Sequence, residues 1–136
     1  MGEDKGRQPA YEKLKFYQEI CELRKRISEI TKSFPRENIR LISQMKDAAR
    51  SAKQNIREGY RKGSAGEFEH SIRISQGSLE ELAGDVEDSL EDGLITKEQR
   101  DNIVRLINSA TYLSGRYIIS LRKMKLENKW KKPFVE

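Results

Sequence analysis

The sequence predicts an all-α protein, an antiparallel up-down-up-down four-helix bundle. Apolar residues recur at helical and not strand spacing, and short polar breaks separate four long periodic segments. Of the 136 residues 36% are charged and 35% hydrophobic, a balance typical of amphipathic helices. Short connections between long helices favour antiparallel neighbours. The same periodicity also fits a long-helix oligomer whose helices share a core across subunits, and this rival architecture stays open.

Phe34-Pro35 separates the first two helices, because the residue before a proline is pushed out of the helical region. We expect the first helix over about residues 10–33. The second follows Pro35 and ends at Lys62, with Gly63 suited to a left-handed cap. The apolar face of the first helix consists of Tyr11, Leu14, Tyr17, Cys21, Ile27 and Ile30. The narrower, alanine-rich face of the second consists of Ile39, Ile42, Met45, Ala49, Ala52, Ile56 and Tyr60.

Capping boxes open the third and fourth helices. In "SAGE" (residues 64–67) and "TKEQ" (residues 96–99), a hydroxyl and a polar side chain three residues on can satisfy the free amides of a first turn. The third helix ends at Asp92-Gly93. The predicted domain is therefore a bundle over residues 10–127, with a flexible leader over residues 1–9 and a flexible basic tail over residues 128–136.

Composition narrows the location and class of the protein. The single cysteine, Cys21, rules out an internal disulfide and favours a reducing compartment. No apolar run approaches the roughly 20 residues of a membrane span. We therefore expect a cytoplasmic protein without a membrane partner. A net charge of +5 permits an anionic partner without demanding one.

Charge is sorted by segment. Residues 1–65 hold 16 cations and 9 anions, whereas residues 66–100 hold 3 cations and 10 anions. On the second helix a basic stripe runs one residue, or about 100°, away from the apolar face. The stripe consists of Lys46, Arg50, Lys53, Arg57 and Arg61, and Lys62 follows it.

Two hypotheses explain the basic stripe. It can bind the phosphates of RNA or single-stranded DNA, because each cation that neutralises a phosphate releases counterions. Alternatively, the acidic third helix neutralises it, and the protein is an oligomeric adaptor or scaffold with a protein partner. Trp130, between Lys129 and Lys131, can stack on a base or anchor the tail by packing.

The sequence does not predict an enzyme, a metal or a cofactor. His70 is the only histidine, and its neighbours Glu67 and Arg73 indicate a surface charge network. We expect Cys21 to be buried and inert. The carboxylates of the third helix lack the Glu-x-x-His pairs of di-metal bundles. Gly77 and Gly84, seven residues apart, predict close helix contact.

Several short sequence motifs occur in a characteristic order. They are Phe34-Pro35, Ser43-Gln44, residues 48–51 (AARS), residues 55–59 (NIREG), Ser64 with Glu67-Phe68, and residues 77–82 (GSLEEL). In this respect the chain resembles the four-helix bundle family found in intervening sequences of bacterial 23S ribosomal RNA genes. It departs from that pattern at Arg57, where a small residue is usual, and at Ser75-Gln76.

The resemblance implies a homopentamer of four-helix bundles. It also implies kinship with the accessory protein of diversity-generating retroelements, which binds nucleic acid and a reverse transcriptase. We expect Asn55, Glu58 and Gly59 to tie the second helix down within the bundle or across a subunit contact. Structural or interface roles are likewise expected for Gly77, Ser78 and Glu81.

Overall fold

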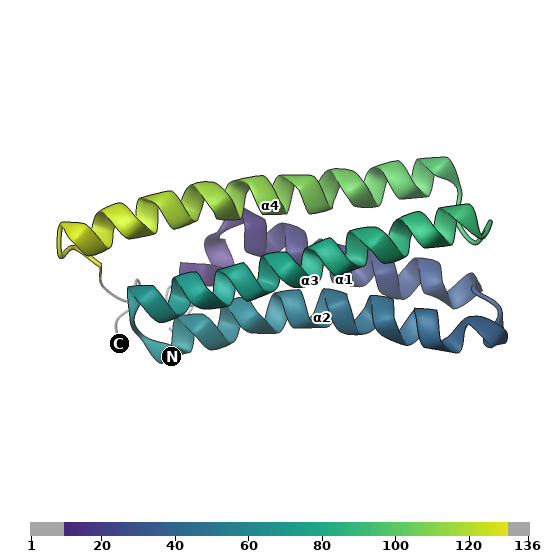
Figure 1. Ribbon diagram of the computed structural model, residues 1–136, viewed down its shortest axis with the longest axis horizontal. Helices are drawn as coiled ribbons and strands as arrows, with labels where there is room; N and C mark the ends of the chain where they lie inside the picture. Colours follow the sequence, from purple (N-terminus) through teal and green to yellow (C-terminus); the bar gives the residue numbers. More distant parts are fainter. Residues whose placement is uncertain (1–9, 131–136) are drawn as a thin grey trace, which may run out of the picture.

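The computed structural model describes residues 10–130 and forms a four-helix bundle (Figure 1). The helices are α1 (Lys15–Ile30), α2 (Ile39–Lys62), α3 (Ala65–Glu91) and α4 (Lys97–Leu126). Successive helices run in opposite directions, and each packs against two others, in the pairs α1–α2, α2–α3, α3–α4 and α1–α4. The predicted fold class is confirmed. The predicted leader (residues 1–9) and most of the predicted tail (residues 131–136) lie outside the described residues.

The first predicted helix is divided into three pieces. A 3-10 helix over Ala10–Lys13 precedes α1, and another over Thr31–Ser33 follows it. Between the first two pieces, Leu14 has an extended backbone with ψ 129°. At the other end the Thr31 hydroxyl donates to the Ile27 carbonyl at 2.7 Å, and Phe34 is extended before Pro35, as the proline rule predicts.

Local capping chemistry places the helix ends close to where the sequence predicts them. Gly63 takes the left-handed conformation with φ 88°, which ends α2 and turns the chain into α3. Thr96 and Gln99 form a full capping box at the start of α4. At the start of α3, Ser64 accepts from the Glu67 amide, but the Glu67 carboxylate accepts from the Ser64 hydroxyl at 3.0 Å, so this box is only half formed.

Aromatic rings fill the end of the core nearest the α2–α3 turn. Tyr60 packs against Tyr11 at 5.0 Å and Phe68 at 5.7 Å between ring centroids. Trp130 joins this cluster with its ring 6.0 Å from that of Phe68, and its indole nitrogen donates to the Gly63 carbonyl at 3.4 Å. Trp130 therefore packs against the bundle, and packing rather than base stacking accounts for it.

Two apolar expectations are wrong. Ile39 is 62% exposed, because it is the first residue of α2 and lies at the edge of the bundle. Cys21 is half-buried and not fully enclosed, while Phe16, Ile20 and Leu23 supply the fully buried positions that the predicted face of the first helix left out.

Candidate nucleic-acid interface

The basic stripe lies on the flank of α2 that faces α1. Burial raises the pKa of Tyr11 and of Tyr17, and in both cases the positive charge of Arg57 opposes that rise. Arg61 also opposes the rise at Tyr11. Arg57 and Arg61 therefore act on residues of the N-terminal segment, since Tyr11 precedes α1 and Tyr17 belongs to it. Lys53 is half-buried on α2, and Lys62 is exposed in its last turn.

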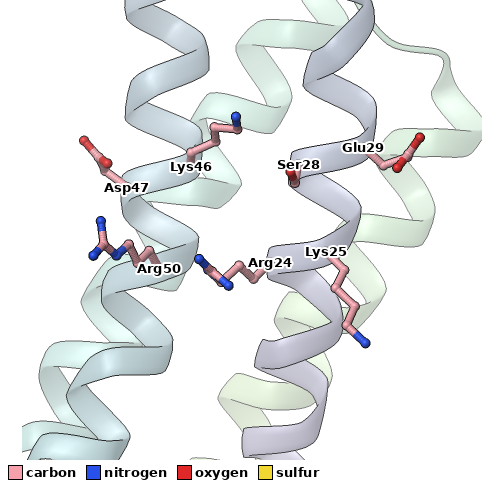
Figure 2. A pocket seen from close by; sticks show the side chains of 7 residues that line it. All are labelled: Arg24, Lys25, Ser28, Glu29, Lys46, Asp47 and Arg50. Carbon is pink, nitrogen blue, oxygen red and sulfur yellow. The ribbon is translucent and has the colours of Figure 1, made fainter.

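An open groove between α1 and α2 gathers cations from both helices (Figure 2). It has a volume of about 670 Å³. Lys46 and Arg24 extend into the gap between the helices, whereas the carboxylates of Asp47 and Glu29 point away from it. The groove is lined by Arg24, Lys25, Ser28, Glu29, Lys46, Asp47 and Arg50. We refer to it as the α1–α2 groove.

The four cations that line the groove outnumber its two carboxylates, Glu29 and Asp47. Over residues 10–130, Arg24, Lys25, Lys46 and Arg50 form no ion pair, nor do Lys53 and Arg57 of the stripe. The alternative hypothesis required α3 to neutralise the stripe. Over the described residues no ion pair joins α2 to α3, because α3 packs on the opposite flank of α2.

The flank of α2 that faces α3 is held by short polar contacts. The hydroxyls of Ser51 and Ser78 are 2.9 Å apart, and the Asn55 amide donates to the Ser51 carbonyl at 2.9 Å. The Ser75 hydroxyl donates to the Ala52 carbonyl at 2.7 Å. Ser78 thus bonds across to α2, whereas the side chain of Asn55 bonds to Ser51 of its own helix. We refer to the contact of Ser51, Ser75 and Ser78 as the serine-lined flank.

Gly59 allows α2 and α3 to approach closely at one end of the serine-lined flank. A methyl group added at Gly59 would overlap Ser71, nearer to its Cβ and Oγ than real side-chain carbons come. Gly59 is therefore a packing residue of the bundle. Its predicted companion Glu58 is exposed and has no hydrogen bond or ion pair within residues 10–130, so the tie expected of Glu58 does not form there.

Gly77 and Gly84 mark no close contact within residues 10–130, so the predicted helix contact does not form there. Both are exposed on α3, and a methyl group added at either would meet nothing within 4 Å. Glu81 is also exposed, and it lines a small acidic hollow with Asp47 and Asp85. Burial and then the charges of Asp88 and Glu81 raise the pKa of Asp85.

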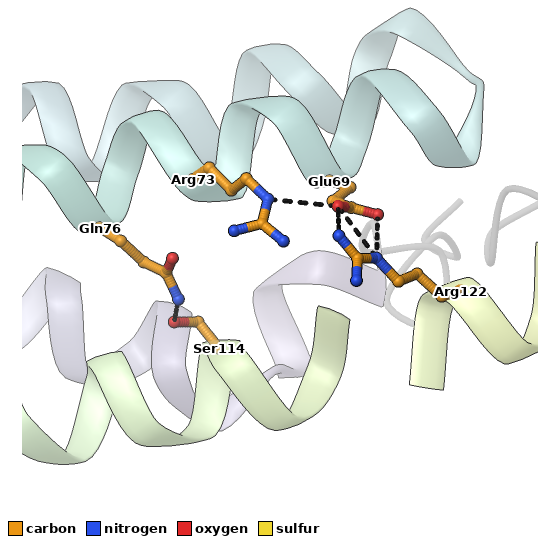
Figure 3. A network of polar contacts seen from close by, with 5 residues as sticks. All are labelled: Glu69, Arg73, Gln76, Ser114 and Arg122. Atoms are coloured by element: carbon orange, nitrogen blue, oxygen red, sulfur yellow. Dashed lines mark hydrogen bonds and ion pairs between the residues drawn. The ribbon is translucent and has the colours of Figure 1, made fainter. Parts of the chain in front are cut away.

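The predicted charge network around His70 forms on a neighbouring residue instead. Arg73 donates to Glu69 at 3.2 Å, and Arg122 of α4 binds the same carboxylate through two nitrogens, the shorter contact being 2.7 Å (Figure 3). The hydrogen bond from Arg122 is the main reason that the pKa of Glu69 is lowered. His70 itself is exposed. This network joins α3 to α4 and is structural.

Sequence reasoning missed Arg24 and Lys25, which complete the groove from the α1 side. The available signal was the run Arg24-Lys25-Arg26, three adjacent cations on a helix whose apolar face was already assigned. Of the three, Arg26 is paired with Glu22 at 2.9 Å.

The described part of the chain contains neither a membrane-spanning helix nor a cluster of metal ligands. No helix within it is long and apolar enough to cross a membrane. Within residues 10–130, no three or more His, Cys, Asp or Glu side chains are grouped so that they could hold a metal ion.

Comparison with models of protein families gives a match. Residues 12–114 match the family model of the 23S rRNA-intervening sequence protein. The match spans most of the chain, so the chain belongs to this family. No curated protein matches it.

Proposed function

We propose that this member of the 23S rRNA-intervening sequence protein family binds RNA or single-stranded DNA in the α1–α2 groove. The observation that carries the proposal is that Arg24 and Lys25 of α1 line one groove with Lys46 and Arg50 of α2, without ion pairs within residues 10–130. Charges that the fold does not neutralise are available to phosphates.

The groove supplies charge and hydrogen-bond donors rather than a surface for reading bases. Its lining side chains include no aromatic ring, and Trp130 is packed against Phe68. Arginine and lysine contacts to phosphate position a nucleic acid without specifying its sequence. We therefore propose backbone binding with strong salt dependence and weak sequence preference.

The test measures binding of fluorescently labelled structured RNA, single-stranded DNA and duplex DNA over a range of salt concentrations. A Lys46→Glu, Arg50→Glu variant should bind at least about tenfold more weakly, because a hydrogen bond to a charged group contributes about 1.5–3 kcal/mol. Its log–log salt slope should fall by about 1.4 on single strands for two lost contacts. Both residues are exposed, so the helical signal should not change.

A matched control is Lys97→Glu, Lys123→Glu on α4, which changes the net charge equally outside the groove. This control should keep affinity within a factor of about three, because only distant, screened charge is altered. Equal losses in the two variants would show that binding follows net charge and would contradict the groove. Binding of none of the three nucleic acids would favour the adaptor function instead.

We also propose that the chain acts as a homo-oligomer. Repeating the α1–α2 groove in each subunit would convert a weak patch into an avid one, since linked sites bind with a high effective concentration. Four large apolar residues of α3 and α4 lie exposed within residues 10–130, namely Ile74, Tyr112, Ile119 and Leu126. Light scattering on the purified protein measures the assembled mass against the 15.8 kDa of one chain.

A further inference from the structure

The outer surfaces of α3 and α4 each carry a row of four residues. The two rows have the same spacing when α3 is followed from its N-terminus and α4 from its C-terminus. On α3 the pattern is Gly77, Glu80, Gly84 and Glu91, with steps of three, four and seven. On α4, read from its C-terminal side, it is Ile119, Arg116, Tyr112 and Arg105, with the same steps. Steps of three, four and seven keep residues on one helix face, so each pattern forms a single row.

All eight residues of the two rows face solvent in the single chain. Tyr112 is 63% and Ile119 66% exposed, although both are large and apolar. Gly77 and Gly84 have open space where a side chain would be. Within the described part of the chain, Glu80, Glu91, Arg105 and Arg116 form no ion pair. Inside the α4 row the Arg116 guanidinium donates to the Tyr112 hydroxyl at 3.4 Å. Within residues 10–130, neither row forms a hydrogen bond or ion pair with another helix.

We infer that α3 of one copy packs antiparallel against α4 of a second copy through these rows. In this register Ile119 lies over Gly77 and Tyr112 over Gly84, so that each large side chain meets a position with no side chain. The same register sets Arg116 opposite Glu80 and Arg105 opposite Glu91. Each row extends over 14 steps from residue to residue, or about 21 Å at 1.5 Å per step, so all four pairs align together.

The chemistry of the two rows favours a second copy over docking of α3 in the α1–α2 groove. The groove offers cations to the acidic α3, but its lining includes no large apolar side chain. Specific interfaces need an apolar centre with polar groups around it. The α4 row supplies both, in Tyr112 and Ile119 with Arg105 and Arg116. The contact can form twice in a two-fold pair or once at each junction of a ring.

This inference rests on the homo-oligomer proposed above and names the surface that joins its copies. It also gives a physical reason for two mid-helix glycines. Glycine in a helix interior is unfavourable relative to alanine, and no neighbour among residues 10–130 requires it at Gly77 or Gly84. A closely packed helix from another copy does require it.

The first test is the assembled mass of the full chain by light scattering over a concentration series. Gly77→Leu with Gly84→Leu should weaken association at least tenfold while raising the unfolding temperature of the dissociated chain. Opposite effects on assembly and on chain stability separate a lost interface from a misfolded protein. An oligomer that persists unchanged in this variant overturns the inference.

The second test exchanges the charges. Glu80→Arg with Glu91→Arg should weaken association at least tenfold, as should Arg105→Glu with Arg116→Glu. Combining all four substitutions in one chain should restore assembly, because the opposite charges face each other again. The inference is overturned if the chain with all four substitutions does not assemble. It is also overturned if Lys46→Glu with Arg50→Glu dissociates the oligomer while the α3 and α4 substitutions do not.

These outcomes separate the inference from the proposed function. A wild-type chain that stays monomeric overturns both the inference and the homo-oligomer. Nucleic-acid binding is measured independently by its salt slope and by the Lys46→Glu, Arg50→Glu variant. An oligomer that resists every α3 and α4 substitution overturns only the inference.

Discussion

The two flanks of α2 carry polar residues for different purposes. Toward α3, on the serine-lined flank, Ser51 and Asn55 bond to each other and Ser51 meets Ser78. Toward α1, Lys46 and Arg50 form no ion pair within residues 10–130. A polar group that is bonded inside the bundle is needed for the fold. A charged group that the fold leaves uncompensated is available for a ligand.

Of the substitutions that compare the two flanks, Gly59→Ala should change the free energy of unfolding most. The added methyl group overlaps Ser71, so α2 and α3 must move apart, and overpacking of this kind costs up to about 3 kcal/mol. Urea unfolding followed by helical circular dichroism measures the change. Gly115→Ala, on α4, is the matched control. It should raise the free energy of unfolding by up to about 1 kcal/mol, because its methyl group would make only an ordinary contact with the Gln76 side chain, at 3.9 Å. Equal shifts in the two variants would contradict the close approach at Gly59.

Ser75→Ala should have the next largest effect. Ser75 is 1% exposed, and its hydroxyl donates to the Ala52 carbonyl, so the variant loses a buried hydrogen bond worth about 1 kcal/mol. The same unfolding measurement applies. Ser43→Ala, at an exposed position of α2 outside this flank, should change stability by less than about 0.5 kcal/mol.

Asp85→Asn should increase stability at neutral pH by less than about 1 kcal/mol. Burial and the charges of Asp88 and Glu81 raise the pKa of Asp85 above its ordinary 3.8, so the folded protein binds this proton more tightly than the unfolded chain. The resulting stability is present below pH 3.8 and is lost as the pH rises through the raised folded pKa. Thermal unfolding across that range should therefore show that the stability of wild type relative to Asp85→Asn falls as the pH rises. An identical pH dependence in both proteins would contradict it.

Arg50→Gln should have the smallest effect on stability. The groove cations are not paired within the described residues, so removing one should change the free energy of unfolding by less than about 0.5 kcal/mol. Any change at low salt should be stabilising, because like charges across the groove repel each other. A loss well above that size would place Arg50 in the fold rather than in a ligand site.

The sequence predicts the ends of the helices well because capping is local. Gly63 and the Thr96 box act within one turn, so neighbours in sequence are sufficient to identify them. The division of the first helix at Leu14 was not predictable in this way. Tyr11 turns in to meet Tyr60, a contact between residues far apart in the chain.

The sequence also predicts the basic stripe of α2, but not which neighbour it faces. That depends on how the helices are arranged around the bundle, and periodicity within one helix carries no such information. For the same reason the sequence did not predict that Arg24 and Lys25 line the groove. They do so only because α1 packs beside the stripe. Periodicity also left undetermined which helix the contact predicted at Gly77 and Gly84 involves.

The aromatic cluster near the α2–α3 turn has a consequence for the topology of the chain. Tyr11 precedes α1 and Trp130 follows α4, yet both pack into this cluster, through Tyr60 and Phe68 respectively. The two ends of the described chain thus lie at the same end of the bundle (Figure 1). A circular permutant that links them directly and opens new termini at Gly93 should therefore keep the same helix packing.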